Sequence, residues 1–268
     1  MKVPFSIRYN NVKLKAERLY KTSNHPSSHL FSGLEDISFS LRGGECIHVV
    51  SPVPWANQLF LDTLTGHTPM EAGAIWLQHQ DQWLNLSQLS QRQLNQVRNQ
   101  TMGYLQSSET LRALPTVLDC VLVKFLDLGM SHSQAREHSR HVLDWVGLPR
   151  GLWHRAPANL PLSELNQVNL ARTFAVDYNI IVIGLPLSQL DRANQVRLVE
   201  LIEYRKEKGT CFIGRFDQPE VRTRVCDLSL SLNAPTPITA AGKSRRSQKG
   251  SAGSPIGEVV SSKAVRSY

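Results

Sequence analysis

The sequence predicts an α/β protein with an antiparallel β lobe, a parallel core sheet and a helical insert. Three observations lead to this fold class. Alternating strand patterns fill the first part of the chain, amphipathic helices fill the middle, and helices alternate with continuous apolar runs in the last part. With 268 residues, of which 41% are hydrophobic, the chain is long enough to bury a substantial core.

The first segments have the pattern of an antiparallel sheet. FSIRYNNVKL (5–14) and LEDISFSLRGGECIHVV (34–50) read as strands, and in the second of these apolar residues alternate with polar ones. The dipeptide Gly43–Gly44 is typical of a tight hairpin turn. We therefore expect the strands on either side of this turn to pair with each other.

The next segments alternate between helix and strand. A helix is predicted from about Asn57 to Thr65, because glycine and proline follow it at Gly66 and Pro69. GAIWLQHQDQWLNL (73–86) then reads as two short strands. A polar helix follows these strands, from Leu89 to Arg98.

The middle of the chain is predicted to be a helical insert over about residues 110–160. An apolar stripe marks one helix after Thr116. A second helix opens with Ser131 and Gln134 at the spacing of a capping box, and Gly147 and Pro149 end it.

The last part of the chain alternates helices with buried strands. SELNQVNLARTFAVD (163–177) and RANQVRLVELIEYRKEK (192–208) read as helices, whereas NIIVIGLP (179–186) and TCFIGRF (210–216) read as strands buried on both faces. Strands of this kind, joined by crossover helices, predict a parallel sheet.

The formal net charge of +8 is concentrated in the last residues of the chain. From Pro235 onward six basic residues face one acidic residue, so +5 of this charge lies there, in a segment rich in Gly, Ser and Pro. We interpret the segment 233–268 as a basic, disordered tail that is solvated; contact with nucleic acid or an anionic membrane is the less favoured hypothesis.

Cysteine and histidine usage predicts no metal site. The four cysteines form no CxxC pair, so we expect buried thiols rather than ligands or disulfides. His138 and His141 stand three residues apart but have no acidic or thiol partner at ligand spacing, which favours a solvated helix face. No run of apolar residues is long enough to span a membrane and the N-terminus has no signal-peptide pattern, so we expect a cytoplasmic protein.

The order of these elements resembles the P-loop NTPase-like fold of the ATP-binding cassette (ABC) ATPases. The segments GECIHVV, LWHRAPANL, QVNLARTFAVDYNIIVI and LDRANQ are similar to PhnL, the ATPase-like L component of the carbon–phosphorus lyase (phosphonate) system. The resemblance covers Phe5 to about Leu232. It implies an ABC ATPase-like domain over residues 1–232, with the tail outside it.

The resemblance places the phosphate loop (Walker A) of the family, G-x-x-x-x-G-K-[ST], on SPVPWANQ, residues 51–58. Pro52 and Pro54 have no N–H to offer to a phosphate, and no lysine supplies a positive charge. Trp55 is either an interface anchor or packs over the altered pocket. In order, the two glycines, the lysine and the hydroxyl residue of the pattern fall on Ser51, Ala56, Asn57 and Gln58.

The other catalytic motifs of the family are also replaced. The magnesium-holding aspartate (Walker B) and the catalytic glutamate fall on Gly184 and Leu185, which leaves no carboxylate to fix a metal ion or polarise water. The switch histidine falls on Asp217. Gln106 lies near the Q-loop position, although strict register gives the next residue, and Asp191 matches the D-loop aspartate.

The signature segment completes the site of a partner chain in this family, because cassette ATPases pair head to tail. Both halves are altered here, so the resemblance implies that neither site of a pair would be whole. The family residues S-G-G-E-Q are replaced, in order, by Pro161, Leu162, Ser163, Glu164 and Leu165.

These replacements predict a non-catalytic (pseudo-ATPase) subunit with a binding or scaffold role, no catalytic residues and no cofactor. Its expected partner is another ABC-type subunit or a phosphonate-pathway protein. The alternative is a weak ATP-binding or ATPase subunit, with ATP and magnesium as cofactors, in phosphonate metabolism or transport; this needs a substitute cation, for which Lys13, Lys15 and Arg215 are candidates. A product without a role is a third hypothesis, which a deletion phenotype would exclude.

Overall fold

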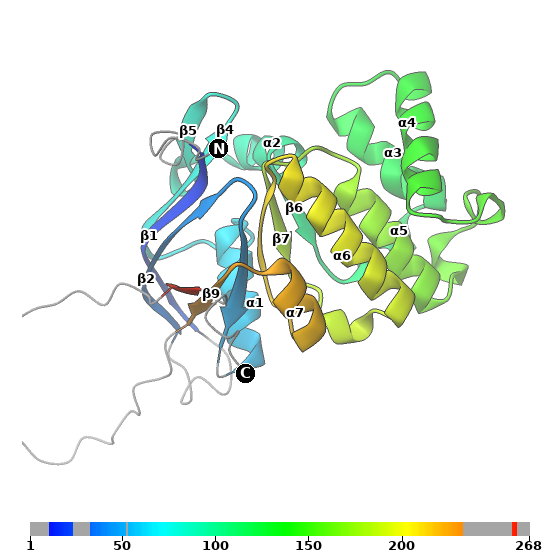
Figure 1. Ribbon diagram of the computed structural model, residues 1–268. Helices are drawn as coiled ribbons and strands as arrows, with labels where there is room; N and C mark the ends of the chain where they lie inside the picture. Colours follow the sequence, from blue (N-terminus) through cyan, green and yellow to red (C-terminus); the bar gives the residue numbers. More distant parts are fainter. Residues whose placement is uncertain (1–10, 24–32, 52, 233–258, 262–268) are drawn as a thin grey trace, which may run out of the picture.

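The computed structural model describes residues 11–23, 33–51, 53–232 and 259–261, which form two β-sheets and a set of helices (Figure 1). The predicted strand residues before Asn11, as well as Pro52, lie outside the described residues. So does the predicted tail, except for β10 (Val259–Ser261), a strand where none was predicted.

The first sheet is antiparallel, as predicted, with the strand order β2-β1-β4-β5. It lies on the left of Figure 1. The first strand extends well beyond the predicted end, because it pairs along its length with β2 on one side and with β4 on the other. The strands are β1 (Val12–Thr22), β2 (Gly33–Arg42), β4 (Ala72–His79) and β5 (Gln82–Asn85).

The second sheet has the order β10-β9-β3-β8-β7-β6, and its strands β9, β3, β8, β7 and β6 run parallel to their neighbours in this row. β10 is antiparallel to β9. The parallel sheet confirms the prediction from the two apolar runs. Its further strands are β3 (Cys46–Val50), β6 (Met102–Leu105), β7 (Ile180–Ile183), β8 (Cys211–Gly214) and β9 (Leu228–Ser231).

The hairpin predicted at Gly43–Gly44 is wrong. β3 does not pair with β2 but joins β8 and β9 in the parallel sheet. Gly44 has φ +82°, a left-handed conformation that glycine adopts without strain, and the turn carries the chain from one sheet to the other. A glycine turn before a short apolar run is compatible both with a β2–β3 hairpin and with a β3 strand in the second sheet. The local sequence therefore could not distinguish these two pairings.

Seven α-helices and five short 3₁₀ helices join the strands in the described residues. The predicted capping box is confirmed: the Ser131 hydroxyl accepts from the Gln134 N–H, and the Gln134 side chain accepts from the Ser131 N–H. The α-helices are α1 (Pro54–Leu64), α2 (Gln91–Gln100), α3 (Val117–Asp127), α4 (His132–Trp145), α5 (Leu162–Phe174), α6 (Arg192–Glu207) and α7 (Pro219–Val225). The 3₁₀ helices are η2 (Leu86–Gln88), η3 (Ser108–Ala113), η4 (Arg150–Leu152), η5 (Pro157–Asn159) and η6 (Leu187–Gln189).

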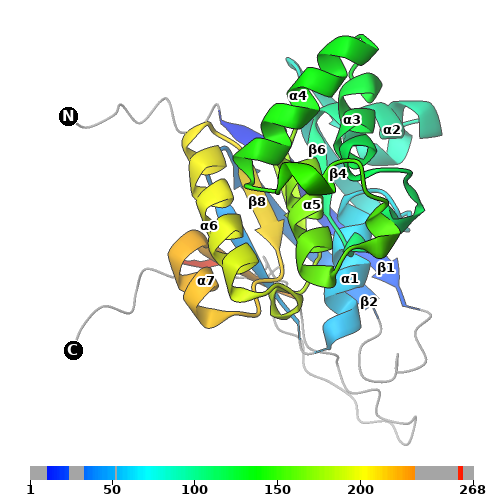
Figure 2. The ribbon, with the colours of Figure 1, turned by 90° about the vertical axis from the view of Figure 1, so that its right-hand side faces the viewer.

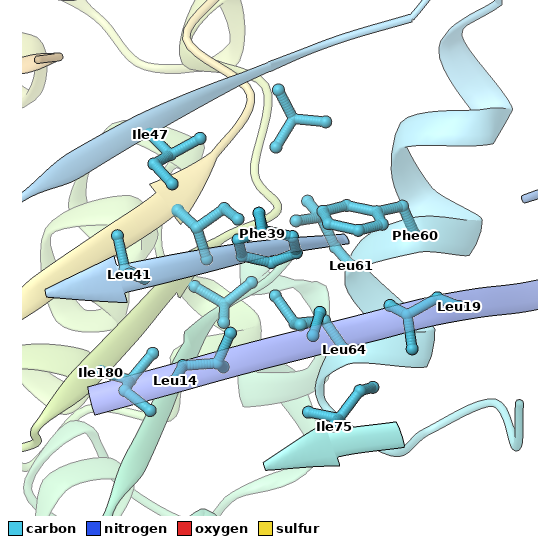
Figure 3. Packing of buried hydrophobic residues seen from close by; sticks show 14 of the residues in the cluster. Leu14, Leu19, Phe39, Leu41, Ile47, Phe60, Leu61, Leu64, Ile75 and Ile180 are labelled. Atoms are coloured by element: carbon cyan, nitrogen blue, oxygen red, sulfur yellow. The ribbon is translucent and has the colours of Figure 1, made fainter. Parts of the chain in front are cut away.

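The core lies on both faces of the parallel sheet. One cluster joins α1 to the antiparallel sheet, where the rings of Phe39 and Phe60 lie 5.9 Å apart (Figure 3). It takes Ile180 and Val182 from β7, whereas the alternate residues Ile181 and Ile183 belong to a second cluster with α5 and α6. This alternation confirms that β7 is buried on both faces.

The helices α5, α6 and α7 lie in front of the parallel sheet when the molecule is viewed from the side, with β8 behind them (Figure 2). A third apolar cluster holds α3, α4 and part of α5 together as the helical insert. None of the helices in the described part of the chain combines the length and the apolar character needed to cross a bilayer.

Candidate functional site

In the described part of the connection between β3 and α1, Ser51, Val53 and Ala56 form hydrogen bonds with one another. The Ser51 hydroxyl donates to the Val53 carbonyl at 3.0 Å and accepts from the Val53 N–H at 3.3 Å. The Ala56 N–H donates to the same carbonyl at 3.2 Å. The helix begins at Pro54 rather than at the predicted Asn57, because proline fits the first helical position. The N–H groups of Val53 and Ala56 therefore point into the turn and not toward a ligand.

The residues at the end of this turn differ in exposure. Ala56 is fully buried, and Asn57, at the position of the family lysine, is only 6% exposed. The Asn57 Oδ1 atom is buried without a hydrogen-bond partner. Trp55 is partly buried and packs against the first core cluster. Of these four side chains, only that of Gln58 is exposed.

Tyr104, near the end of β6, packs against Gly184, which the sequence analysis aligned with the magnesium-holding aspartate of the family. Its hydroxyl accepts from the Gln58 amide at 2.9 Å and donates to Asp62 Oδ1 at 3.0 Å. Its ring lies so close to Gly184 that a Cβ atom on residue 184 would stand 2.6 Å from Tyr104 Cε2. Burial raises the pKa of the Tyr104 phenol, so the hydroxyl stays protonated and remains a donor.

Leu185, at the position of the catalytic glutamate, is part of the core. Its side chain is 2% exposed and belongs to the second core cluster. The N–H groups of Gly184 and Leu185 both donate to the Leu105 carbonyl at 2.9 Å, which fixes the end of β7 against β6. A side chain at residue 185 therefore faces an apolar environment.

Asp217 follows β8 and holds two loops together. Its carboxylate accepts from the Leu187 N–H at 2.9 Å and from the Ser188 hydroxyl at 3.0 Å. The preceding Phe216 is fully buried, and its N–H donates to His48 Nδ1 at 3.1 Å. Burial lowers the pKa of His48 to about 4, so the ring is a neutral acceptor at pH 7.

The signature segment at the start of α5 is bonded within the chain. The Ser163 hydroxyl donates to Asp191, and Asp191 also accepts from the Asn194 N–H at 2.8 Å. The hydrogen bond from Ser163 lowers the pKa of Asp191. Pro161 provides no side-chain cap, and Leu162 is 49% exposed. Glu164 lies in the first turn of the helix.

Gln106 connects the end of β6 to α5 through its backbone carbonyl. Its carbonyl accepts from the Asn169 amide at 2.8 Å. Next to it, the Ser108 hydroxyl donates to Asn166 Oδ1 at 2.8 Å, and Asn166 Nδ2 donates to the Gln189 carbonyl at 3.1 Å. The two asparagines, which the sequence analysis did not single out, bring the segments after β6 and β7 together at α5.

The predicted site residues thus form separate hydrogen-bonded groups. Gln58 joins Tyr104 above Gly184, Asp217 joins η6, and Ser163 joins Asp191. Tyr104 was missed because it is not a motif position in the family. Among the described residues, no three His, Cys, Asp or Glu side chains are placed to hold a metal ion.

The chain, with its antiparallel sheet, its largely parallel sheet and its helices, has the ABC ATPase fold. The dimeric bacterial ABC transporter cassette MJ0796 matches with a TM-score of 0.70 and 18% identity over 82% of this chain and 94% of that one. A second structure of the same protein, bound to ADP and Pi, matches with a TM-score of 0.69 and 17% identity over the same shares.

In sequence, the chain is similar to the ATP-binding protein LolD of the lipoprotein-releasing system. It is 26% identical to LolD of Legionella pneumophila (strain Lens) over 205 residues, 76% of this chain and 88% of that protein. It is 28% identical to LolD of Idiomarina loihiensis over 181 residues, 67% of this chain and 77% of that protein. No protein-family model matches the chain. The chain thus has the ABC ATPase fold and is similar in sequence to ATP-binding proteins of this kind.

Proposed function

We propose that this chain is a non-catalytic ABC-type subunit, a pseudo-ATPase with a binding or scaffold role. The observation that carries the proposal is the ring of Tyr104 against Gly184. An aspartate at residue 184 would require this ring to shift, and the ring is held by the hydrogen bonds of the Tyr104 hydroxyl with Gln58 and Asp62. This packing supports the proposal that the chain does not hold a magnesium ion beside residue 184.

The surrounding residues do not fit a magnesium nucleotide. Magnesium needs oxygen ligands in near-octahedral geometry, and the two carboxylate positions hold Gly184 and the buried Leu185. Asn57 is buried and carries no charge, and each lost charge-assisted hydrogen bond to a phosphate weakens binding by about 1.5–3 kcal/mol. We derive no chemical step through ATP at this site.

The partner that we propose is another ABC-type subunit. Support comes from the relatives, which are named as ATP-binding proteins of a lipoprotein-releasing system, and from the fold neighbour, which is a dimeric transporter cassette. The narrower hypothesis that the chain acts as PhnL in phosphonate metabolism rests on the sequence segments quoted above. The similarity to LolD suggests another process, lipoprotein release, in which the chain would have the same scaffold role.

The alternative function, weak ATP binding or hydrolysis, needs a cation near residues 51–58. Lys13 donates to Gln78 at 3.0 Å, and Lys15 pairs with Glu17. Both lysines therefore have partners within the antiparallel sheet. In the part of the chain that the structure describes, Arg215 forms no hydrogen bond or ion pair with residues 51 or 53–58, and its N–H donates to the Ile183 carbonyl at 3.1 Å. Nucleotide binding by the full chain would favour this alternative.

Turnover of ATP by the purified full chain tests the proposal. We expect phosphate release at the rate of the buffer blank with MgATP, for the wild type and for Asn57→Asp, which adds a negative charge beside the turn. A contaminating ATPase would give the same rate in both preparations. Because Asn57 is only 6% exposed, the Asn57→Asp variant must first keep the circular dichroism spectrum of the wild type. Turnover in the wild type that this folded variant loses would overturn the proposal.

A further inference from the structure

Two cysteines that are far apart in the sequence lie side by side in the core. Cys46 begins β3, and Cys226 lies between α7 and β9. Their Sγ atoms are 3.6 Å apart, and the two residues are 0% and 6% exposed. A disulfide bond is about 2.05 Å long, so the sulfurs need to approach by only about 1.5 Å to bond.

The backbone around this pair is held in place by several hydrogen bonds. The Cys46 N–H donates to Asp227 Oδ2 at 3.0 Å, and the Asp227 N–H donates back to the Cys46 carbonyl at 2.9 Å. Lys206 of α6 donates to Asp227 Oδ2 at 2.6 Å and to the Val225 carbonyl at 2.8 Å. Both neighbours of Cys226 are thus fixed, which keeps the two thiols adjacent.

The other two cysteines have a different environment. Cys120 is in the helical insert and donates to the Thr116 carbonyl at 3.4 Å. Cys211 is in β8 and donates to the Asn179 carbonyl at 3.3 Å. Each of these thiols bonds to a backbone oxygen and not to a second thiol. They are therefore matched controls within the same chain.

We propose that Cys46 and Cys226 are an oxidisable pair that forms an intramolecular disulfide with a peroxide. In the first step a Cys226 thiolate attacks a peroxide oxygen, which gives a sulfenic acid and releases water after protonation. In the second step Cys46 sulfur attacks the sulfenic sulfur, the S–O bond breaks and a second water leaves. Two thiols and one hydrogen peroxide thus give one disulfide and two waters.

The order of these steps follows from access. Burial raises the pKa of the Cys46 thiol well above its ordinary value, which makes Cys46 a poor first nucleophile. Cys226 follows α7, a short helix with several exposed residues, so local opening of this helix lets a small oxidant reach its sulfur. The disulfide would join β3, the strand that leads to the candidate site, to the segment between α7 and β9.

Peptide mapping of the full chain tests this proposal. Reduced protein is treated with hydrogen peroxide, remaining thiols are alkylated, and the digest is analysed without reduction. We expect a peptide that links Cys46 to Cys226, with Cys120 and Cys211 recovered as alkylated thiols. Because a cross-link restricts the unfolded chain, the melting temperature should rise by several degrees and return to its original value with dithiothreitol.

Single substitutions distinguish a disulfide between Cys46 and Cys226 from non-specific oxidation of the four cysteines. Cys46→Ser and Cys226→Ser should each abolish the cross-link and the rise in melting temperature, whereas Cys120→Ser and Cys211→Ser should leave both intact. If a serine variant fails to fold, Cys46→Ala and Cys226→Ala replace it, and the mapping of the wild type stands by itself. Protein that keeps its circular dichroism spectrum but shows only sulfinic acid, other pairings or no link would overturn the proposal.

Discussion

The two halves of the candidate site are closed by different kinds of interaction. On the phosphate-loop side, Leu185 is part of the core and Tyr104 packs onto Gly184. On the signature side, the exposed Ser163 bonds to Asp191 at the surface, beside the exposed Leu162. We therefore expect substitutions on the phosphate-loop side to lower the free energy of unfolding. We expect substitutions on the signature side, such as Ser163→Ala, to lower the free energy of unfolding only slightly.

The largest expected effect is that of a carboxylate at residue 185. Leu185→Glu restores the residue type of the family but buries an unpaired charge, so we expect the free energy of unfolding to fall by about 3 kcal/mol or more. Leu185→Met keeps the volume and should cost less than about 1.5 kcal/mol. Urea denaturation measures both. Equal stabilities of the two variants would mean that this position is not part of the core.

A smaller effect is expected for an aspartate at residue 184. Gly184→Asp forces its Cβ against the Tyr104 ring, and overpacking of this kind costs about 1–3 kcal/mol. Tyr104→Ala removes the ring, so the double variant should be more stable than the sum of the single effects predicts, by about 0.5–3 kcal/mol. Additive effects in a double-mutant cycle would contradict the contact between the two residues.

Removal of the Tyr104 hydroxyl should have a modest effect. Tyr104→Phe keeps the ring but loses the hydrogen bonds to Gln58 and Asp62, which predicts a loss of about 1 kcal/mol in urea denaturation. The variant also separates ring from hydroxyl, because the ring still blocks residue 184. A gain of MgATP binding in Tyr104→Phe would show that the hydroxyl, and not the ring, closes the site.

The smallest effect is expected on the signature side and depends on pH. The hydrogen bond from Ser163 lowers the pKa of Asp191 from its ordinary value of 3.8. A carboxylate with a lowered pKa stabilises the fold above that ordinary value, and this contribution is lost as the pH falls through the folded pKa. The stability difference between the wild type and Ser163→Ala should therefore be present at pH 7 and shrink below pH 3.8. A difference that is independent of pH would contradict this interaction.

The sequence predicted correctly those elements that short-range patterns define. The apolar runs of β7 and β8 are short and bounded by turn residues, which favours buried strands over helices, and the Ser131 capping box indicates a helix start. The pairing of β3 could not be predicted, because a turn at Gly44 is compatible with either sheet. Pairing depends on contacts with distant strands, which local patterns do not contain.

The candidate site was predictable at its motif positions only. The resemblance to the family singled out Gly184 and Leu185, which directly follow β7, but it gave no information about Tyr104, which lies between motifs in the sequence. A sequence pattern that could have indicated this contact is an aromatic residue on β6 together with a glycine directly after the adjoining strand β7. The missing Cβ of such a glycine leaves space for the ring.

The most direct test of the central claim is the thermal unfolding of the full chain with and without millimolar MgATP, with magnesium alone as the control. The account predicts no change in melting temperature, because the proposed scaffold subunit binds no nucleotide. A ligand at about 100 times its dissociation constant stabilises a protein by about 2.7 kcal/mol. A magnesium-dependent rise of several degrees would therefore contradict the account and establish a nucleotide site in this chain.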